Sequence, residues 1–286
     1  TKKFIDIQGI KVLIGEISSN ATSAMIPIVE QENAFLFAPA SSSPKLTNIS
    51  KNFARNWPSD IAEAGSAASY VSEKLKSTKI GVVYVNSDYG IGLQRKFETS
   101  LLEKGVNLFV KLGYKQGESD FTNLILKQDL GDLETLYLDG NPKEMGIFIK
   151  QFRGYGLKAN IVSNTGFLQN DCLIVAGVWA NNVVVPTPYF NVDDVSAEPE
   201  MKKFIDLFES KHGKKPTLVN ANGYDAVYIL YNAYLKNSKR TQDMGRLVRN
   251  LKKYRSASGV IDFIDGDVEV PIKYVKIIDG KQVNLF

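Results

Sequence analysis

The sequence VLIGEISSNAT, from Val12 to Thr22, and the sequence FLFAPASSSPKLT, from Phe35 to Thr47, decide the fold of this chain. Each is an apolar run that ends in small hydroxyl residues, and a helix-like stretch at 23–31 separates them. A strand, a helix and a second strand predict a parallel crossover, in which both strands end at the same edge of the sheet. Ligands of open α/β sheets bind at that edge. The two serine-rich turns therefore predict a pocket for a small molecule.

The first serine turn favours an anion in particular. Ser18 and Ser19 are expected at the N-terminus of the helix that follows the first strand. Free N–H groups and the helix dipole favour an anion such as a carboxylate there. The alternative is that Ser18 and the serines at 41–43 only cap helices and form turns, which serine also favours. Spacing alone leaves both interpretations open.

Length and charge narrow the class of protein. The 286 residues suffice for one large or two medium domains, each with a sizeable core. The net charge of +4 comes from lysines spread along the chain, whereas nucleic-acid binding would need a concentrated basic patch, so no nucleic-acid partner is expected. No apolar run approaches the roughly 20 residues of a membrane span. We expect that any export signal has been removed or is absent from this sequence.

The residues that most hydrolytic and zinc chemistry requires are scarce. The chain has one histidine, His212, among lysines, and one cysteine, Cys172, beside a run of apolar residues that predicts a buried structural thiol. The chain therefore has too few histidine and cysteine residues for the common zinc sites and for Ser–His or Cys–His catalysis. The acidic pair Asp193 and Asp194 shows no metal-ligand spacing. We predict no catalytic residue, no metal site and no cofactor.

The rest of the chain alternates between two kinds of segment. A helix-like segment is expected at 1–8, an extended linker at 52–60, and a helix at 60–77. Strands, the first four each followed by a helix, are expected at 79–88, 106–114, 133–140, 160–165 and 181–190. This alternation predicts a parallel sheet covered on both faces. Helices are then expected at 197–211, 218–237 and 241–254, and strands at 259–267 and 271–283.

Several stretches along the whole chain together resemble one known family. They include IGEISSNAT (14–22), FAPASSSPKLT (37–47), VNSDYGIGL (85–93), NPKEMGIFIKQFRGYGLK (141–158) and VIDFIDGDVEVPIKYVKIIDGK (260–281). The chain is similar to the type I periplasmic solute-binding proteins, in the branched-chain amino-acid (Leu/Ile/Val) group of ABC importers.

The resemblance implies a fold. It is an α/β fold of two Rossmann-like lobes joined by a three-strand hinge. Lobe one would hold residues 1–58 and 190–258, and lobe two residues 59–189 and 259–286. Lobe one would lack the N-terminal β-α-β unit that the family carries.

The resemblance also implies a function. The chain would be the periplasmic or extracellular solute-binding component of an ABC importer, and not an enzyme. It would act as a monomer that closes on a small carboxylate or amino-acid-like ligand and docks on a membrane permease. The alternative is a ligand-sensing domain of a receptor or an amide-type regulator, which use the same fold.

The family pattern assigns the ligand's α-carboxylate to the two serine turns, and the matching positions are Ser19 and Ser42. Their neighbours Ser18 and Ser41 are predicted as ligand-binding residues too. The backbone carbonyl of Ala40 would accept from an α-ammonium. Neutral hydroxyl and N–H groups can bind a carboxylate by charge-assisted hydrogen bonds.

Lobe two would supply Tyr89, Asn141 and Thr165. Asn141 stands where the amino-acid binders have a tyrosine, and Thr165 where they have the acidic residue that pairs with the ammonium. Burying an ammonium without a carboxylate costs several kcal/mol. The sequence therefore predicts a small carboxylate or another polar organic solute in place of a standard amino acid.

Overall fold

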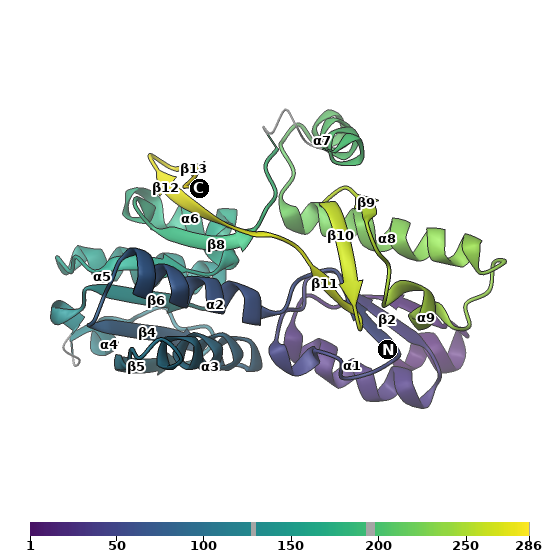
Figure 1. Cartoon of the computed structure of the whole chain (residues 1–286), viewed down its shortest axis with the longest axis horizontal. Coiled ribbons are helices and arrows are strands. Elements are labelled where there is room, and N and C mark those ends of the chain that lie inside the picture. The colour runs from purple at the N-terminus through teal and green to yellow at the C-terminus, as the bar shows by residue number, and fades with distance from the viewer. Residues whose placement is uncertain (127–129, 193–197, 286) are drawn as a thin grey trace. The chain divides into compact units, whose positions relative to one another are not determined.

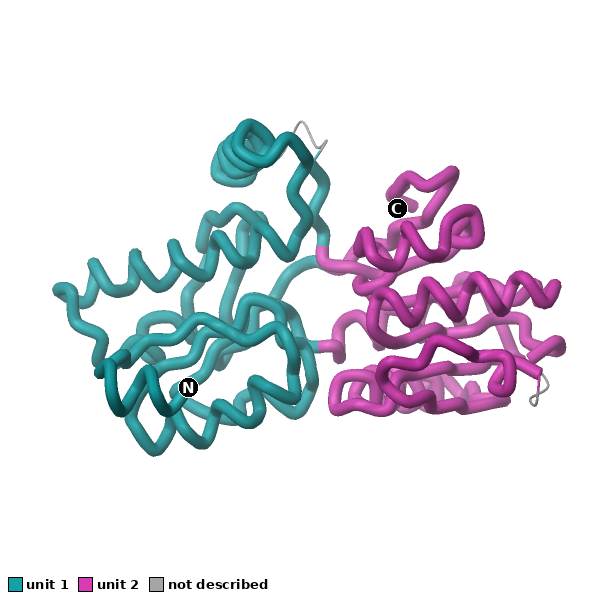
Figure 2. The backbone as a smooth tube through the Cα atoms, turned by 180° about the vertical axis from the view of Figure 1, so that it is seen from behind, with its two compact units in different colours: residues 1–59, 189–271 teal, residues 60–188, 272–286 magenta. Residues whose placement is uncertain are grey.

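The computed structural model describes residues 1–126, 130–192 and 198–285, so the predicted acidic pair Asp193 and Asp194 lies outside the described residues. The chain forms two compact units, coloured separately in Figure 2. Unit 1 comprises Thr1–Ser59 and Tyr189–Pro271, and unit 2 comprises Asp60–Pro188 and the chain from Ile272 onward.

The sheet of unit 1 contains the predicted crossover. Parallel pairing joins β1 to β2 and β2 to β3, and helix α1 connects the first two strands (Figure 1). The order across the sheet is β1-β2-β3-β11-β10-β9. Its strands are β1 (Val12–Ile14), β2 (Phe35–Ala38), β3 (Phe53–Arg55), β9 (Tyr254–Ser256), β10 (Gly259–Ile264) and β11 (Asp267–Glu269).

Two expectations for unit 1 differ from the structure. The predicted linker at 52–60 contains strand β3, because Phe53–Arg55 pairs with β2 on one side and β11 on the other. Residues 259–271 belong to unit 1, although the resemblance assigned them to lobe two. They do so because β11 pairs with β3 and β10 pairs with β9, which ties the segment into the first sheet.

Helices cover both faces of this sheet. Apolar residues of α1, such as Ile26 and Val29, pack with Leu36 on one face, while α8 and α9 pack against Phe37 on the other. The helices of unit 1 are α1 (Ser19–Gln31), α7 (Pro199–His212), α8 (Leu218–Lys236) and α9 (Met244–Val248), with short helical segments η1 (Lys3–Ile7) and η2 (Pro44–Leu46).

Unit 2 is built on one larger sheet of order β13-β12-β8-β7-β6-β4-β5. Five neighbouring strands of this sheet run parallel to one another, as predicted from the alternation: β8, β7, β6, β4 and β5. Strand β12 is antiparallel to both β8 and β13. The strands are β4 (Ile80–Val85), β5 (Leu108–Tyr114), β6 (Thr135–Asp139), β7 (Asn160–Ser163), β8 (Val184–Pro188), β12 (Ile272–Ile278) and β13 (Lys281–Asn284).

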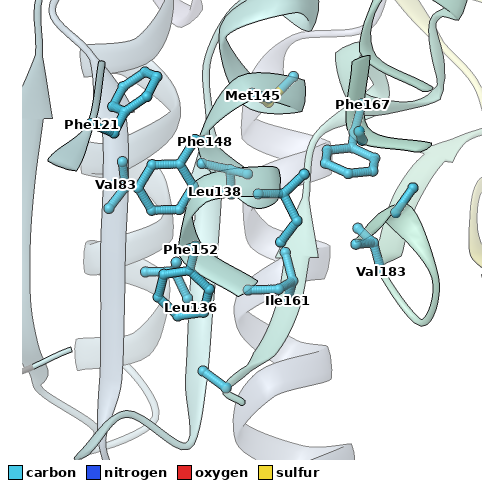
Figure 3. Close-up of a cluster of buried hydrophobic side chains, with 14 of the residues drawn as sticks. Val83, Phe121, Leu136, Leu138, Met145, Phe148, Phe152, Ile161, Phe167 and Val183 are labelled. Atoms are coloured by element: carbon cyan, nitrogen blue, oxygen red, sulfur yellow. The ribbon is translucent and has the colours of Figure 1, made fainter. Parts of the chain in front are cut away.

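Alternation along these strands separates two apolar layers. Val83 and Leu138 face α4, α5 and α6, where Phe148 and Phe152 pack against the sheet (Figure 3). Tyr137 faces α2 and α3 in the other layer. The helices are α2 (Asp60–Ser69), α3 (Asp88–Leu102), α4 (Thr122–Leu126), α5 (Pro142–Gly154) and α6 (Asn170–Ala176), with short segments η3 (Tyr70–Lys74), η4 (Leu130–Asp132), η5 (Thr165–Leu168) and η6 (Gly177–Ala180).

Two predictions about single features can be compared directly with the structure. Cys172 is fully buried in the α4–α6 layer, as predicted, and burial raises the pKa of its thiol to about 12. The thiol is therefore protonated at neutral pH. Within the described ranges, none of the helices combines the length and the apolar character that crossing a membrane demands.

Candidate functional site

The two serine turns of unit 1 lie against each other at the carboxyl ends of β1 and β2. The Ser41 hydroxyl donates to the carbonyl of Glu16 at 2.7 Å and shares a hydrogen bond with the Thr22 hydroxyl at 2.5 Å. The backbone N–H of Ser43 donates to the Ser19 hydroxyl at 3.1 Å. The structure therefore brings together the two segments that the sequence analysis singled out.

A buried arginine holds the second turn in place. The side chain of Arg55 is fully buried and forms a bidentate pair with Asp267, at 2.8 Å and 2.9 Å. Its remaining donors reach the carbonyls of Ser41 and Ser43, at 3.3 Å and 2.8 Å, and the Thr47 hydroxyl at 2.8 Å. A planar guanidinium presents its donors in a fixed fork, so these bonds fix the path of the turn.

The hydrogen bonds separate the structural serines from those that remain open. Ser41 bonds within the two turns, and Ser43 accepts from the N–H of Lys45 at the start of η2. Ser18 is the N-cap residue of α1, but its hydroxyl makes no capping bond. Among the residues that the structure describes, no partner is found for the Ser42 hydroxyl, which is 5% exposed. The capping interpretation therefore holds for Ser43, whereas the described part of the chain offers no hydrogen-bond partner to the hydroxyls of Ser18 and Ser42.

The start of α1 already binds one carboxylate oxygen. The N–H of Ser18 donates to Oε2 of the exposed Glu16 side chain at 3.1 Å. The first intrahelical bond of α1 runs from the N–H of Thr22 to the carbonyl of Ser18. The N–H groups of the three residues between them have no acceptor within the helix. The Ala40 residue lies at the start of the second turn, and the role of its carbonyl as an acceptor for the ligand stays a prediction.

Unit 2 brings its three predicted residues to one edge of its sheet. Tyr89 is the second residue of α3, after β4; Asn141 is the N-cap residue of α5, after β6; and Thr165 opens η5, after β7. These strands are parallel neighbours, so their carboxyl ends share an edge. The Asn141 amide donates to Glu144 at 3.0 Å, and the Thr165 hydroxyl donates to Thr187 at 2.9 Å. The hydroxyl proton of Thr165 is therefore used in a hydrogen bond within unit 2.

The sequence analysis missed a group of acidic residues beside Thr165. The N–H of Thr165 donates to Oε2 of Glu63 at 3.1 Å, and the Asn164 amide donates to Oδ1 of Asp139 at 2.9 Å. Asp60, Glu63 and Asp139 are at most 3% exposed. Burial first, and then the charge of Asp60, raise the pKa of Asp139 well above its usual value. Asp60 and Glu63 lie in the first turn of α2, where acidic residues are common because they suit the helix dipole, so no local signal marks them in the sequence.

Two tyrosines complete this edge. Burial and the nearby carboxylates raise the pKa of both Tyr89 and Tyr137 well above the ordinary tyrosine value. Both hydroxyls are therefore donors at any physiological pH. Tyr137 is fully buried, whereas Tyr89 is partly exposed.

Comparisons with known proteins agree with this architecture. A family model described as "Periplasmic binding protein" matches residues 1–281. The Leu/Ile/Val/Thr-binding protein of Salmonella typhimurium is 31% identical over 204 residues, which are 71% of this chain and 55% of that protein. The Leu/Ile/Val-binding protein homolog 1 of Brucella melitensis is 27% identical over 283 residues, or 96% of this chain and 74% of the relative. The chain thus spans about half the length of the first of these relatives.

Solved structures show the same fold. The leucine binding protein LivK from Thermotoga maritima superposes with a TM-score of 0.92 at 23% identity, covering 99% of this chain and 81% of that one. A solute binding protein from R. palustris in complex with benzoate gives 0.87 at 17% identity, covering 99% and 79%. The α/β fold predicted from the resemblance is confirmed.

Proposed function

We propose, from the premise that this chain belongs to the periplasmic binding protein family, that it is the solute-binding component of an ABC importer. Its solute is a small carboxylate-bearing or polar organic molecule. The printed names of its relatives describe binders of branched-chain amino acids, and one structural neighbour holds benzoate. All of these ligands carry a carboxylate, which is the feature that this proposal transfers.

The observation that carries the proposal is that the serine turns present hydroxyl and backbone N–H groups that can donate hydrogen bonds to a ligand. Ser18 and Ser42 have hydroxyls without capping or turn bonds, and the first N–H groups of α1 lack helical acceptors. Hydroxyl and N–H donors at a helix N-terminus suit a carboxylate. The bond between Ser18 and Glu16 supports this chemistry, because it is such a carboxylate contact within the chain.

Residues of unit 2 complete the site in this proposal. Tyr89 and Asn141 are the donors, and the solute is held when the two units close on it. Closure is a shift between open and closed populations, and the solute drives it only by the extra contacts that it makes in the closed form. A membrane permease then recognises the closed form on the periplasmic or extracellular side. The protein binds its solute without transforming it.

The test is direct identification of the ligand. The purified chain is analysed by native mass spectrometry for co-purified molecules, and then titrated by calorimetry with a panel of amino acids, organic acids and aromatic carboxylates. We expect one class of carboxylate to bind. Ser42→Ala is expected to weaken that binding about tenfold or more, because a hydrogen bond to a charged group is lost.

Ser210→Ala is the matched control, because Ser210 is an exposed serine of α7 in the same unit. It should leave the affinity unchanged. The proposal fails if no carboxylate in the panel binds, or if Ser42→Ala and Ser210→Ala behave alike.

A further inference from the structure

A cavity lies in unit 2 at the edge of the sheet where its parallel strands begin. It has a volume of about 560 Å³, and Asn160 and Val184, the first residues of β7 and β8, both line it. Tyr89, Asn141 and Thr165 follow the carboxyl ends of parallel strands, so the cavity lies at the opposite edge of the same sheet. A cavity of this size suits a small organic molecule.

Three cationic side chains line this cavity, and none of its described lining residues is acidic. They are Arg153 in the last turn of α5, Lys158 in the loop that follows, and Lys276 on β12. Within the ranges that the structure describes, none of the three forms an ion pair. The lining therefore carries three positive charges that no lining carboxylate offsets, and such a cavity attracts an anion.

Arg153 is held in place through one of its terminal nitrogens. Nη1 donates to the carbonyl of Trp179 at 2.6 Å and to the carbonyl of Asn181 at 2.5 Å. These bonds join α5 to the end of η6. For Nε and Nη2, the described part of the chain offers no acceptor. The guanidinium group is thus anchored at one nitrogen, while its other donors stay available.

The available donors of Arg153 are the pair that binds an anion elsewhere in this chain. Arg55 holds the two oxygens of Asp267 with Nε and Nη2, at 2.8 Å and 2.9 Å. These two nitrogens form one edge of the planar guanidinium, and their spacing matches a carboxylate or a phosphate. Burial lowers the pKa of Arg153, because water that would stabilise its charge is partly excluded. A bidentate anion would give Arg153 the compensation that Arg55 receives from Asp267.

Apolar groups form much of the remaining lining. Trp179, whose carbonyl anchors Arg153, lines the cavity and is 38% exposed. Leu157 and Ile161 line it as well. An indole ring offers a large apolar surface to an organic group. The cavity therefore suits a molecule that has an anionic group at one end and an apolar body.

We propose that this cavity binds a small organic phosphate, with the phosphate on Nε and Nη2 of Arg153 and the organic part beside Trp179. Lys158 and Lys276 supply further positive charge. A phosphate monoester carries a charge of about −1.5 to −2 at neutral pH, whereas a carboxylate carries one, so a phosphate matches three cations better. The site lies wholly in unit 2 and does not depend on the serine turns of unit 1.

The test titrates the purified full chain with phenyl phosphate, inorganic phosphate and phenol, followed by calorimetry and by tryptophan fluorescence. The chain has two tryptophans, Trp179 in unit 2 and Trp57 in unit 1. We expect phenyl phosphate to bind more tightly than inorganic phosphate and to change the fluorescence, and phenol not to bind. Trp179→Phe should remove the fluorescence change, while calorimetry still detects binding.

Arg153→Lys keeps the positive charge and loses the two-pronged edge. It should weaken the binding of phenyl phosphate about tenfold or more, because hydrogen bonds to a charged group are lost. Lys158→Gln, at an exposed loop position, should weaken it about two- to fivefold. Lys143→Gln is the control and should leave the affinity unchanged, because Lys143 is an exposed lysine at the start of α5 and does not line the cavity. If Arg153→Lys does not fold, as judged by circular dichroism, Lys276→Gln takes its place and should weaken binding as Lys158→Gln does.

Binding of phenyl phosphate that weakens in Arg153→Lys and in Lys158→Gln, but not in Lys143→Gln, supports the proposal. Failure of phenyl phosphate to bind overturns it, and so does an affinity that is the same in Arg153→Lys and in Lys143→Gln. A fluorescence change that survives Trp179→Phe also overturns it, because the phosphate would then be reported by Trp57 in unit 1. Equal affinities for inorganic phosphate and phenyl phosphate would contradict the place given to the organic part.

Discussion

Replacing Arg55 by methionine is expected to destabilise unit 1 and to loosen the second serine turn. The change removes a bidentate pair with Asp267 and three further hydrogen bonds, to the carbonyls of Ser41 and Ser43 and to the Thr47 hydroxyl. Breaking a buried pair by removing one partner costs about 3–5 kcal/mol. Because 14% of the Asp267 side chain is exposed, water can reach the remaining carboxylate. We therefore expect the lower end, about 3 kcal/mol.

The assay is urea unfolding followed by circular dichroism, with the transition of unit 1 resolved from that of unit 2. Lys79→Met is the control, because Lys79 and Asp132 form an ion pair with side chains 49% and 66% exposed. An exposed pair contributes little, so this change should shift stability by less than about 1 kcal/mol. A loss below about 1 kcal/mol in Arg55→Met would refute the reasoning. It would mean that the guanidinium does not hold the turn.

Three further predictions concern single positions. Gly140→Ala is expected to destabilise unit 2 by about 1–3 kcal/mol in thermal unfolding, because an added Cβ would clash with the Tyr114 hydroxyl. An unchanged midpoint would contradict this contact. Cys172 should react with a thiol reagent only as the protein unfolds, because its thiol is buried and has a pKa of about 12; rapid labelling of the native protein at neutral pH would count against it. Glu16→Gln should strengthen carboxylate binding about two- to fivefold, because it removes a like charge beside the N–H of Ser18; weaker binding in calorimetry would argue that Glu16 helps to hold the solute.

The regular part of the fold could be predicted because its signals are local. Apolar runs followed by helix-like segments predicted the parallel strands of unit 2 and the β1–α1–β2 crossover. Strand β3 was missed because its three residues carry no pattern of their own and are strands only through pairing with β2 and β11. The assignment of 259–271 failed for a similar reason, since the partner β3 lies about 200 residues earlier in the chain.

In the candidate site too, the residues with a local sequence signal could be predicted and those that depend on long-range contacts could not. The serine turns could be found because their residues are contiguous, although only the structure shows that Ser43 is a capping residue and that Ser42 is open. The interpretation of Thr165 was incomplete, because the carboxylate beside it comes from Glu63 in a different helix. A pattern read one position at a time cannot find charge that the fold supplies from elsewhere in the chain.

The central claim is that a carboxylate of the solute binds at the serine turns of unit 1. It is tested most directly by titrating the ¹⁵N-labelled full chain with the ligand that calorimetry identifies and following the backbone amide resonances. We predict that the N–H signals of Ser19, Asn20, Ala21 and Ser42 shift downfield together and saturate at the calorimetric stoichiometry. If these four signals stay in place while the ligand binds, the carboxylate is held elsewhere and the account is wrong.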